Sequence, residues 1–268
     1  MANKKRILTD YAIPPGETLK EELEYINMTQ KELAIRLGVS PKTINQIIKG
    51  EAPITPETAA GLENVLGIDA VFWLNLEANY QADLARLKSM PKEREIELTK
   101  KFPYSELAKL RCVPNTRKPL ERALNLRKFF GVSSLENVEK LALASNFRRK
   151  PTKSSSFYAL LAWLRLAEII AQKQLENVSV FSRKAVLESL ESLRTLTYCE
   201  EGFDKKIISI CAKVGIAVVF LPSIKGTSIQ GAAKWIAPDK ALIAITSRYK
   251  WADIFWFSLF HEIGHLYL

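Results

Sequence analysis

The stretch that decides the N-terminal fold is TQKELAIRLGVSPKTINQIIKG, residues 29–50. Thr29 and Glu32 have the T-x-x-E spacing of a capping box, which predicts a helix start, and Gly38 supplies the stop. Ser40 can cap a second helix that has a proline at its first position, where a missing N–H costs nothing. Two short helices joined by a three-residue turn are typical of a helix-turn-helix motif.

The second helix is expected to have a buried side and a polar side. Ile44, Ile47 and Ile48 recur at helical spacing and predict the buried stripe. The outward positions are then Lys42, Thr43, Asn45, Gln46 and Lys49. Amides match the bidentate edge of adenine, ammonium groups can reach phosphate or guanine, and a threonine methyl can meet a thymine methyl. With Gln30 placed to hold a phosphate at the start of the preceding helix, these residues predict a surface that reads DNA. The alternative is an ordinary helical hairpin with a polar face.

The excess positive charge of the chain lies outside the predicted helix-turn-helix segment. The 268 residues carry a formal net charge of +10, which makes nucleic acid the default partner, and their number predicts about two domains. Residues 1–80 hold eight basic and eleven acidic side chains, a net charge of −3, whereas residues 81–155 have a net charge of +10 and residues 156–268 of +3. The middle block, which ends in FRRKPTKSSS, is interpreted as helices with a solvated basic face and an exposed linker. A dedicated nucleic-acid site there is the alternative.

Cysteine content and hydropathy bear on location. Three cysteines without a C-x-x-C pair argue against a disulfide framework and a cysteine zinc site, and they favour a reducing compartment. The N-terminus lacks the apolar run of a signal peptide, and the richest apolar stretch, residues 251–260, contains Asp253 and is too short to span a bilayer. We therefore expect a soluble, cytoplasmic protein with no membrane partner.

The second chemical motif is an H-E-x-x-H near the C-terminus that contains the chain's two histidines, His261 and His265. Four residues apart on a helix, their imidazoles share one face and can hold one zinc ion at about 2 Å from each nitrogen, with Glu262 as general base for a metal-bound water. The alternative is a buried helix whose histidines only pack and hydrogen-bond. A catalytic zinc needs a third protein ligand; an upstream one would be a cysteine or an acid such as Asp239 or Asp253, and none lies in a recognisable motif.

Residues 14–80 resemble the HigA-type antidote branch of the XRE helix-turn-helix family. The resemblance lies in PGETLKEEL, GVSPKTINQIIKG, PITPETA and FWLNLEANY. It implies a five-helix, lambda-repressor-like domain that binds double-stranded operator DNA as a homodimer and neutralises a cognate toxin, commonly an RNA-cleaving one. Pro14 stands where the family's usual H-P-G-E begins, a departure away from the reading helix.

Residues 210–268 resemble the first half of the ImmA/IrrE metallopeptidase family. The resemblance implies metal-ligand roles for His261 and His265 and the base role for Glu262. In that family a later acidic residue, in a helix with an E-x-x-A-N-x-F-A-like pattern, completes the site, and that helix has no counterpart here. We therefore expect a partial α+β, zincin-like domain, truncated after its motif helix, with an incomplete zinc site.

Together these patterns predict a mainly α fold in three parts. Residues 1–80 form the helix-turn-helix domain, 81–155 a basic helical middle with a linker, and 156–268 helices followed by part of the peptidase-like domain. The favoured function is a DNA-binding transcriptional regulator of the antidote type, because the reading helix is intact and the zinc site is not. A zinc metallopeptidase acting in regulation and an antitoxin that binds its toxin directly are the alternatives.

Overall fold

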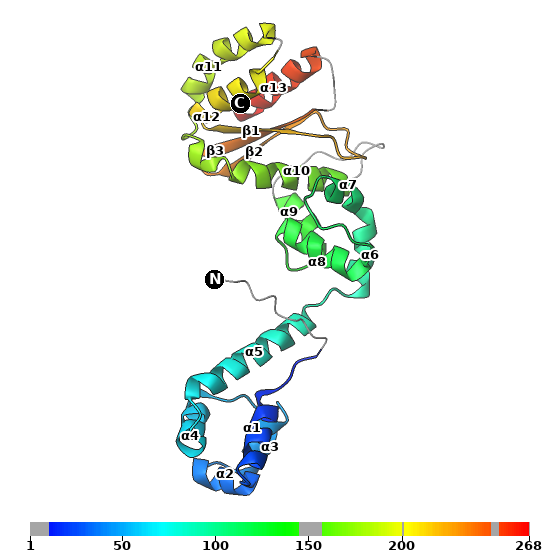
Figure 1. Ribbon diagram of the computed structural model, residues 1–268. Coiled ribbons are helices and arrows are strands. Elements are labelled where there is room, and N and C mark those ends of the chain that lie inside the picture. Colours follow the sequence, from blue (N-terminus) through cyan, green and yellow to red (C-terminus); the bar gives the residue numbers. More distant parts are fainter. Residues whose placement is uncertain (1–10, 145–156, 200, 248–251, 268) are drawn as a thin grey trace. The chain divides into compact units, whose positions relative to one another are not determined.

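The computed structural model describes residues 11–144, 157–199, 201–247 and 252–267. It divides into two compact units, Met1–Met90 and Pro91–Leu268 (Figure 1). The fold is mainly helical with one small sheet, as the sequence predicts. The domain boundaries that the sequence indicates, after residues 80 and 155, stay predictions. The expected FRRKPTKSSS linker lies almost wholly outside the described residues.

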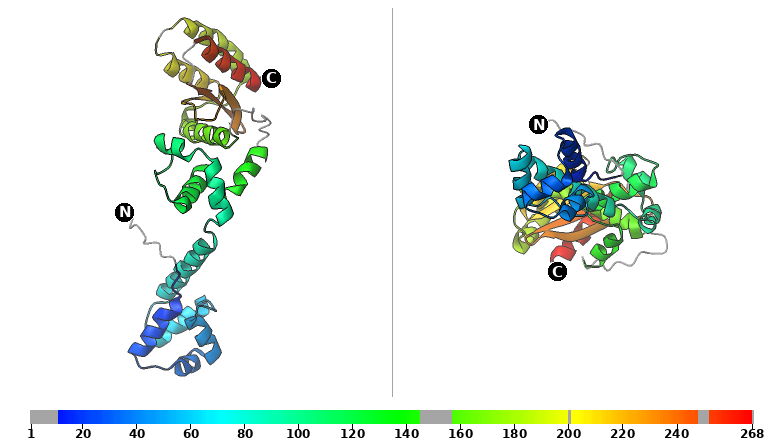
Figure 2. Two further views of the ribbon diagram at one scale, coloured as in Figure 1. Left: turned by 90° about the vertical axis from the view of Figure 1, so that its right-hand side faces the viewer. Right: turned by 90° about the horizontal axis from the view of Figure 1, so that it is seen from below.

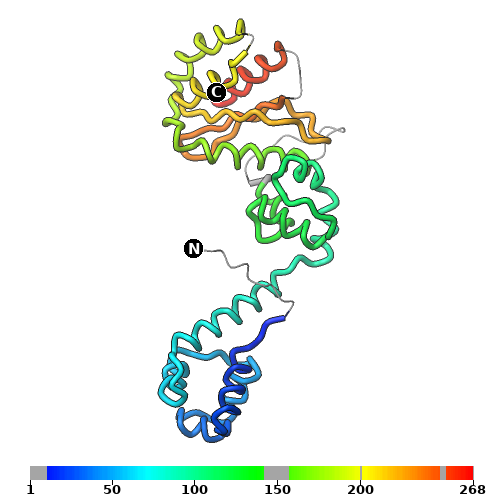
Figure 3. The backbone as a smooth tube through the Cα atoms, viewed as in Figure 1, coloured from blue at the N-terminus to red at the C-terminus, as the bar shows by residue number. Residues whose placement is uncertain are grey.

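The first unit is built from consecutive helices around one core (Figure 3). These are α1 (Pro15–Tyr25), α2 (Gln30–Leu37), α3 (Pro41–Ile48), α4 (Pro56–Leu66) and α5 (Ala70–Lys88). Leu19 of α1, Leu33 of α2, Ile44 of α3, Leu62 of α4 and Trp73 of α5 are fully buried. One side chain from each helix therefore meets in the same apolar centre, which fixes the helices relative to one another.

The second unit begins with short helices that pack on a long one. They are α6 (Glu93–Leu98), η1 (Thr99–Lys101), α7 (Tyr104–Lys109), α8 (Pro119–Phe130) and α9 (Glu136–Ala144), followed by α10 (Phe157–Gln172) and η2 (Leu175–Asn177). Helix α10 is apolar on several faces, because it is covered by α8 on one side and by the sheet on another. The helices of the basic middle thus share a core with the C-terminal part of the chain.

The remaining elements form a helix-covered sheet. They are α11 (Arg183–Thr195), η3 (Leu196–Tyr198), α12 (Phe203–Lys213), β1 (Ile216–Leu221), β2 (Gly231–Ala237), β3 (Lys240–Thr246) and α13 (Ala252–Tyr267). The strand order is β1-β3-β2, with β1 parallel and β2 antiparallel to β3. The strands that the sequence indicates in IAVVFLP and ALIAIT are confirmed as β1 and β3.

The two faces of the sheet are covered by different helices (Figures 1 and 2). Along β1, Ala217 and Val219 pack in the core that contains α10, whereas Ile216 and Val218 pack in the core of α11, α12 and α13. This alternation follows the two-residue period of a strand, and burial on both faces explains the continuous apolar run in its sequence. Helix α13 also contacts β2, so its motif residues lie beside that strand.

No helix among the described residues combines the length and apolarity that crossing a lipid bilayer requires.

Candidate functional site

The helix-turn-helix motif forms as its capping residues predict. The Thr29 hydroxyl accepts a hydrogen bond from the Glu32 backbone N–H at 3.1 Å, and Gly38 ends α2 in the left-handed conformation, φ 67°. The Ser40 hydroxyl accepts from the Thr43 N–H at 3.1 Å and starts α3. These bonds satisfy helix-terminal groups that would otherwise lack partners, and they fix the turn between α2 and α3.

Helix α3 separates its apolar and polar sides completely. Ile44, Ile47 and Ile48 are at most 9% exposed. On the other side Lys42, Asn45 and Lys49 are exposed, while Thr43 and Gln46 are half-buried. The Thr43 hydroxyl lies 2.9 Å from that of Ser40, so its oxygen serves the helix cap, and Lys49 is the C-cap residue. Gln30, the first residue of α2, is half-buried.

The back of α3 is held by close contact with α1. A Cβ added at Gly16 would lie 2.3 Å from the Ile47 carbonyl oxygen and 2.3 Å from the Ile48 Cα, distances that real Cβ atoms do not show. Only glycine lets the two backbones approach this closely. The glycine of the PGE segment therefore sets the distance between the reading helix and the core.

A buried carboxylate fixes the segment that follows α3. Glu77 of α5 is 8% exposed; its Oε2 accepts from the Ile54 backbone N–H at 3.0 Å and its Oε1 from the Gln81 amide at 2.8 Å. Sequence reasoning missed both Glu77 and Gly16 as supports of the reading helix. The glutamate in the otherwise apolar FWLNLEANY segment is the signal that could have found it, since a charge on a buried helix face needs a partner.

The second candidate site lies on α13. His261 and His265 are exposed, and their Nε2 atoms are 3.0 Å apart. Glu262 is only 4% exposed and faces β2, where a Cβ at Gly231 would lie 2.8 Å from its Cγ. The motif glutamate is therefore buried against a glycine, while both imidazoles stay open to solvent. Both interpretations of the motif, metal ligands or histidines that only pack and hydrogen-bond, stay predictions.

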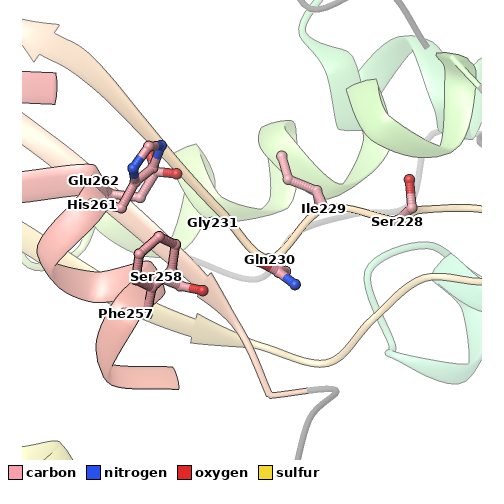
Figure 4. A pocket seen from close by; sticks show the side chains of 8 residues that line it. All are labelled: Ser228, Ile229, Gln230, Gly231, Phe257, Ser258, His261 and Glu262. Atoms are coloured by element: carbon pink, nitrogen blue, oxygen red, sulfur yellow. The ribbon is translucent and has the colours of Figure 1, made fainter. Parts of the chain in front are cut away.

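A pocket of about 160 Å³ opens between α13 and the segment that enters β2 (Figure 4). It is lined by Ser228, Ile229, Gln230, Gly231, Phe257, Ser258, His261 and Glu262. The ring of Phe257 stacks on that of His261, with 5.8 Å between centroids. The pocket thus places one imidazole and the buried carboxylate of the motif beside the same small volume.

Two of the ligands of a zinc site are available in this arrangement. Two nitrogens bound to one zinc ion at about 2.0–2.1 Å lie roughly 3 Å apart, which the His261 and His265 pair fits. Among the described residues, no third His, Cys, Asp or Glu joins them in a group that could hold a metal ion. The upstream acids Asp239 and Asp253 therefore do not complete the set. A zinc site at this pair stays a prediction.

The geometry of α2, the turn and α3 defines the chain as a helix-turn-helix protein. A family model described as "Helix-turn-helix" matches residues 19–73. The HTH-type transcriptional regulator YddM of Escherichia coli K12 is 32% identical over 83 residues, which cover 28% of this chain and 88% of the relative. Virulence-associated protein I of Dichelobacter nodosus is 41% identical over 75 residues, 28% of this chain and 69% of that protein. The chain belongs to the helix-turn-helix family of DNA-binding regulators.

Solved structures of antidote proteins are similar to the same part of the chain. An addiction module antidote protein of the HigA family from Coxiella burnetii is 37% identical and covers 29% of this chain and 86% of its own, with a TM-score of 0.29. The Pseudomonas aeruginosa antitoxin HigA, solved with the higBA promoter, is 33% identical. The match covers 28% of this chain and 83% of the HigA chain, with a TM-score of 0.27. The resemblance of residues 210–268 to metallopeptidases stays a prediction.

Proposed function

We propose that the protein is a transcriptional regulator that reads operator DNA in the major groove with α3. The single observation that carries this proposal is the division of α3 into a buried isoleucine face and an opposite polar face on which Lys42, Asn45 and Lys49 are exposed. A polar helix face held rigidly at the surface suits a major groove, which admits one α-helix. The match to a transcriptional regulator over 88% of that relative's length supports the same function.

The roles of the individual side chains follow from their positions. Exposed Asn45 and half-buried Gln46 supply amides for adenine edges, and Lys42, in the first turn of α3, is placed for guanine or phosphate. The Thr43 hydroxyl is engaged by Ser40, so Thr43 offers DNA its methyl group. Lys49 at the C-cap and Gln30 at the start of α2 are assigned to phosphates on either side of the reading helix.

The test is binding of the full chain to promoter DNA from upstream of its own gene. Changing Lys42, Asn45 and Gln46 together to Ala removes three outward groups without touching the isoleucine face. Since each good base contact is worth about 1–3 kcal/mol, we expect specific binding to fall to the level seen with mixed-sequence DNA. A matched control changes Gln172, Lys173 and Asn177, the same residue types at exposed positions of the second unit, to Ala. Equal promoter affinity in both variants would overturn the proposal.

We propose a second function for α13, binding of a divalent metal ion such as zinc, because the two exposed imidazoles lie at ligand spacing. Stoichiometric zinc in the purified chain, measured by elemental analysis, is expected to disappear in the His261→Ala, His265→Ala variant. Zinc content that is absent, or equal in the variant, contradicts this function. Peptidase activity requires a third ligand in addition, and unchanged proteolysis in Glu262→Gln would argue against it.

The partners that the antidote resemblance implies, a homodimer and a cognate toxin, are part of the same proposal. Co-purification of a toxin encoded beside this gene supports the antitoxin role. A monomer that rescues no toxin opposes it.

A further inference from the structure

The loop between α7 and α8 carries cations that the rest of the fold does not use. Among the described residues, the guanidinium groups of Arg111 and Arg117 have no hydrogen-bond or ion-pair partner, and both residues are exposed. They lie on residues 110–117, which we call the basic loop. Its flanking lysines are also exposed, Lys109 at the end of α7 and Lys118 at the start of α8.

The basic loop is rigidly anchored at its centre. Tyr104 is only 3% exposed. Its hydroxyl donates a hydrogen bond to the Pro114 carbonyl at 2.6 Å and accepts one from the Asn125 amide at 2.9 Å. Arg122 Nε donates to the Thr116 carbonyl at 2.9 Å, and its guanidinium lies over the Tyr104 ring, 5.0 Å from the centroid. Arg111 and Arg117 therefore project from a fixed backbone, so binding through them costs little ordering.

The acidic side chains next to the loop are already engaged. Glu121 accepts from the Thr116 hydroxyl at 2.6 Å and pairs with Lys118 at 3.0 Å, and Glu106 pairs with Lys109 at 2.8 Å. The cations left over are Arg111 and Arg117, and no described carboxylate lies within ion-pair distance of either. The loop thus presents net positive charge to solvent.

The backbone at Arg111 is a second, independent sign that the side chain is retained for a purpose. Arg111 has φ 57°, and it closes α7 as Cys112 N–H donates to Leu107 O at 2.9 Å. Glycine is the residue usually found at this left-handed position, as Gly38 and Gly131 show after α2 and α8. Arginine there is strained, and an observed backbone outlier is a reason to look for a functional role of the side chain.

We propose that the basic loop is a second DNA contact, in which Arg111 and Arg117 bind phosphates of duplex DNA without reading its sequence. This inference rests on the proposed function, because the DNA that α3 reads is the polyanion the chain already meets. Residues 1–80 have a net charge of −3, so the reading domain attracts DNA weakly by itself, whereas residues 81–155 have a net charge of +10. Arginine also matches phosphate geometry with its planar fork of donors.

The experiment measures binding of the full chain to a mixed-sequence DNA duplex over a series of salt concentrations. The Arg111→Gly, Arg117→Gln variant removes both free cations, and glycine suits the backbone at position 111. If each arginine neutralises one phosphate, the slope of log affinity against log salt falls by about two, and affinity drops several-fold for every sequence alike. The matched control, Lys205→Gln with Lys206→Gln, removes two exposed charges from α12.

A slope that stays at the wild-type value in the basic-loop variant overturns the proposal, as does an equal change in the control, which would indicate bulk charge alone. Loss of binding to single-stranded RNA with unchanged duplex binding also overturns it, in favour of an RNA partner. An Asn45→Ala, Gln46→Ala variant of α3, which removes no charge, separates this inference from the proposed function. It should lose preference for the promoter and keep the wild-type salt slope on mixed-sequence DNA, whereas the basic-loop variant should keep the preference.

Discussion

Gly16 lies on the buried side of the first unit, against the helix that we propose reads DNA. A Cβ at this position would meet backbone atoms of the last turn of α3, at Ile47 and Ile48. Because the neighbouring atoms are main chain, a side chain at position 16 cannot be accommodated by a rotamer change. The spacing of α1 and α3 thus depends on the absence of one methyl group.

We predict that Gly16→Ala destabilises the first unit by roughly 1–3 kcal/mol, the usual cost of overpacking a core, and weakens promoter binding because α3 shifts outward. Chemical denaturation followed by circular dichroism measures the first effect and a gel-shift titration the second.

Gly61→Ala in α4 is the matched control for this substitution. The nearest atom to its new Cβ is the Leu37 Cδ2 at 2.7 Å, the end of a flexible side chain. Because alanine is about 1 kcal/mol more favourable than glycine in a helix interior, the free energy of unfolding of the first unit should stay the same or rise. If both variants lost the same stability, the contact between α1 and α3 would not be the cause.

The residues that the sequence predicted correctly are those whose roles are local. Caps at Thr29 and Ser40 and the buried face of α3 follow from spacing within a single segment, and the structure confirms them. Gly16 and Glu77 escaped prediction because each acts on a backbone group more than twenty residues away in the chain. Which groups lie next to them depends on how the helices pack, and the sequence of a single segment does not show this.

At the scale of elements, one ion pair joins three pieces of the second unit. The carboxylate of Glu95 on α6 accepts from Arg127 Nε of α8 at 2.7 Å and from the Leu135 backbone N–H, just before α9, at 2.8 Å. Burial raises the pKa of Glu95, but the hydrogen bonds from Arg127 and Leu135 and the charge of Arg127 outweigh it, so the net pKa lies below the usual glutamate range.

This shift predicts how the second unit responds to acid. A carboxyl whose pKa is lowered in the folded state contributes stability that is fully present at pH values above its pKa in the unfolded chain. This stability is lost as the pH falls through its pKa in the folded protein. We expect unfolding free energy to decline below about pH 4.

Glu95→Gln should remove this component of the acid response and, because it removes the negative charge that faces the half-buried Arg127 guanidinium, cost roughly 3–5 kcal/mol at neutral pH. Denaturation of the two proteins across this pH range checks both statements. Parallel acid profiles in wild type and variant would exclude Glu95 as a source of the response.

Strands and helices were predictable to different degrees. The sequence predicts β1 and β3 as apolar runs, and the structure confirms them. Strand β2 was not predicted, because its sequence GAAKWIA is short of β-branched residues and its conformation depends on pairing with β3. The position of Glu262 against Gly231 follows from that pairing and could not be predicted from the sequence either.

At the scale of the whole molecule, charge and reading function lie in different parts of the chain. The reading helix belongs to a segment with net charge −3, and the surplus of +10 belongs to residues 81–155. On the functions we propose, specificity would come from a few placed groups on α3, and general attraction to DNA from cations such as those of the basic loop.

The central claim is that α3 reads the promoter, and the most direct measurement compares two dissociation constants. They are those of the full chain on its own promoter and on mixed-sequence DNA at one salt concentration, for wild type and for the Lys42, Asn45 and Gln46 to Ala variant. The account predicts a clear preference for the promoter in the wild type that disappears in the variant, with both proteins equally folded. A variant that keeps the wild-type preference would contradict it.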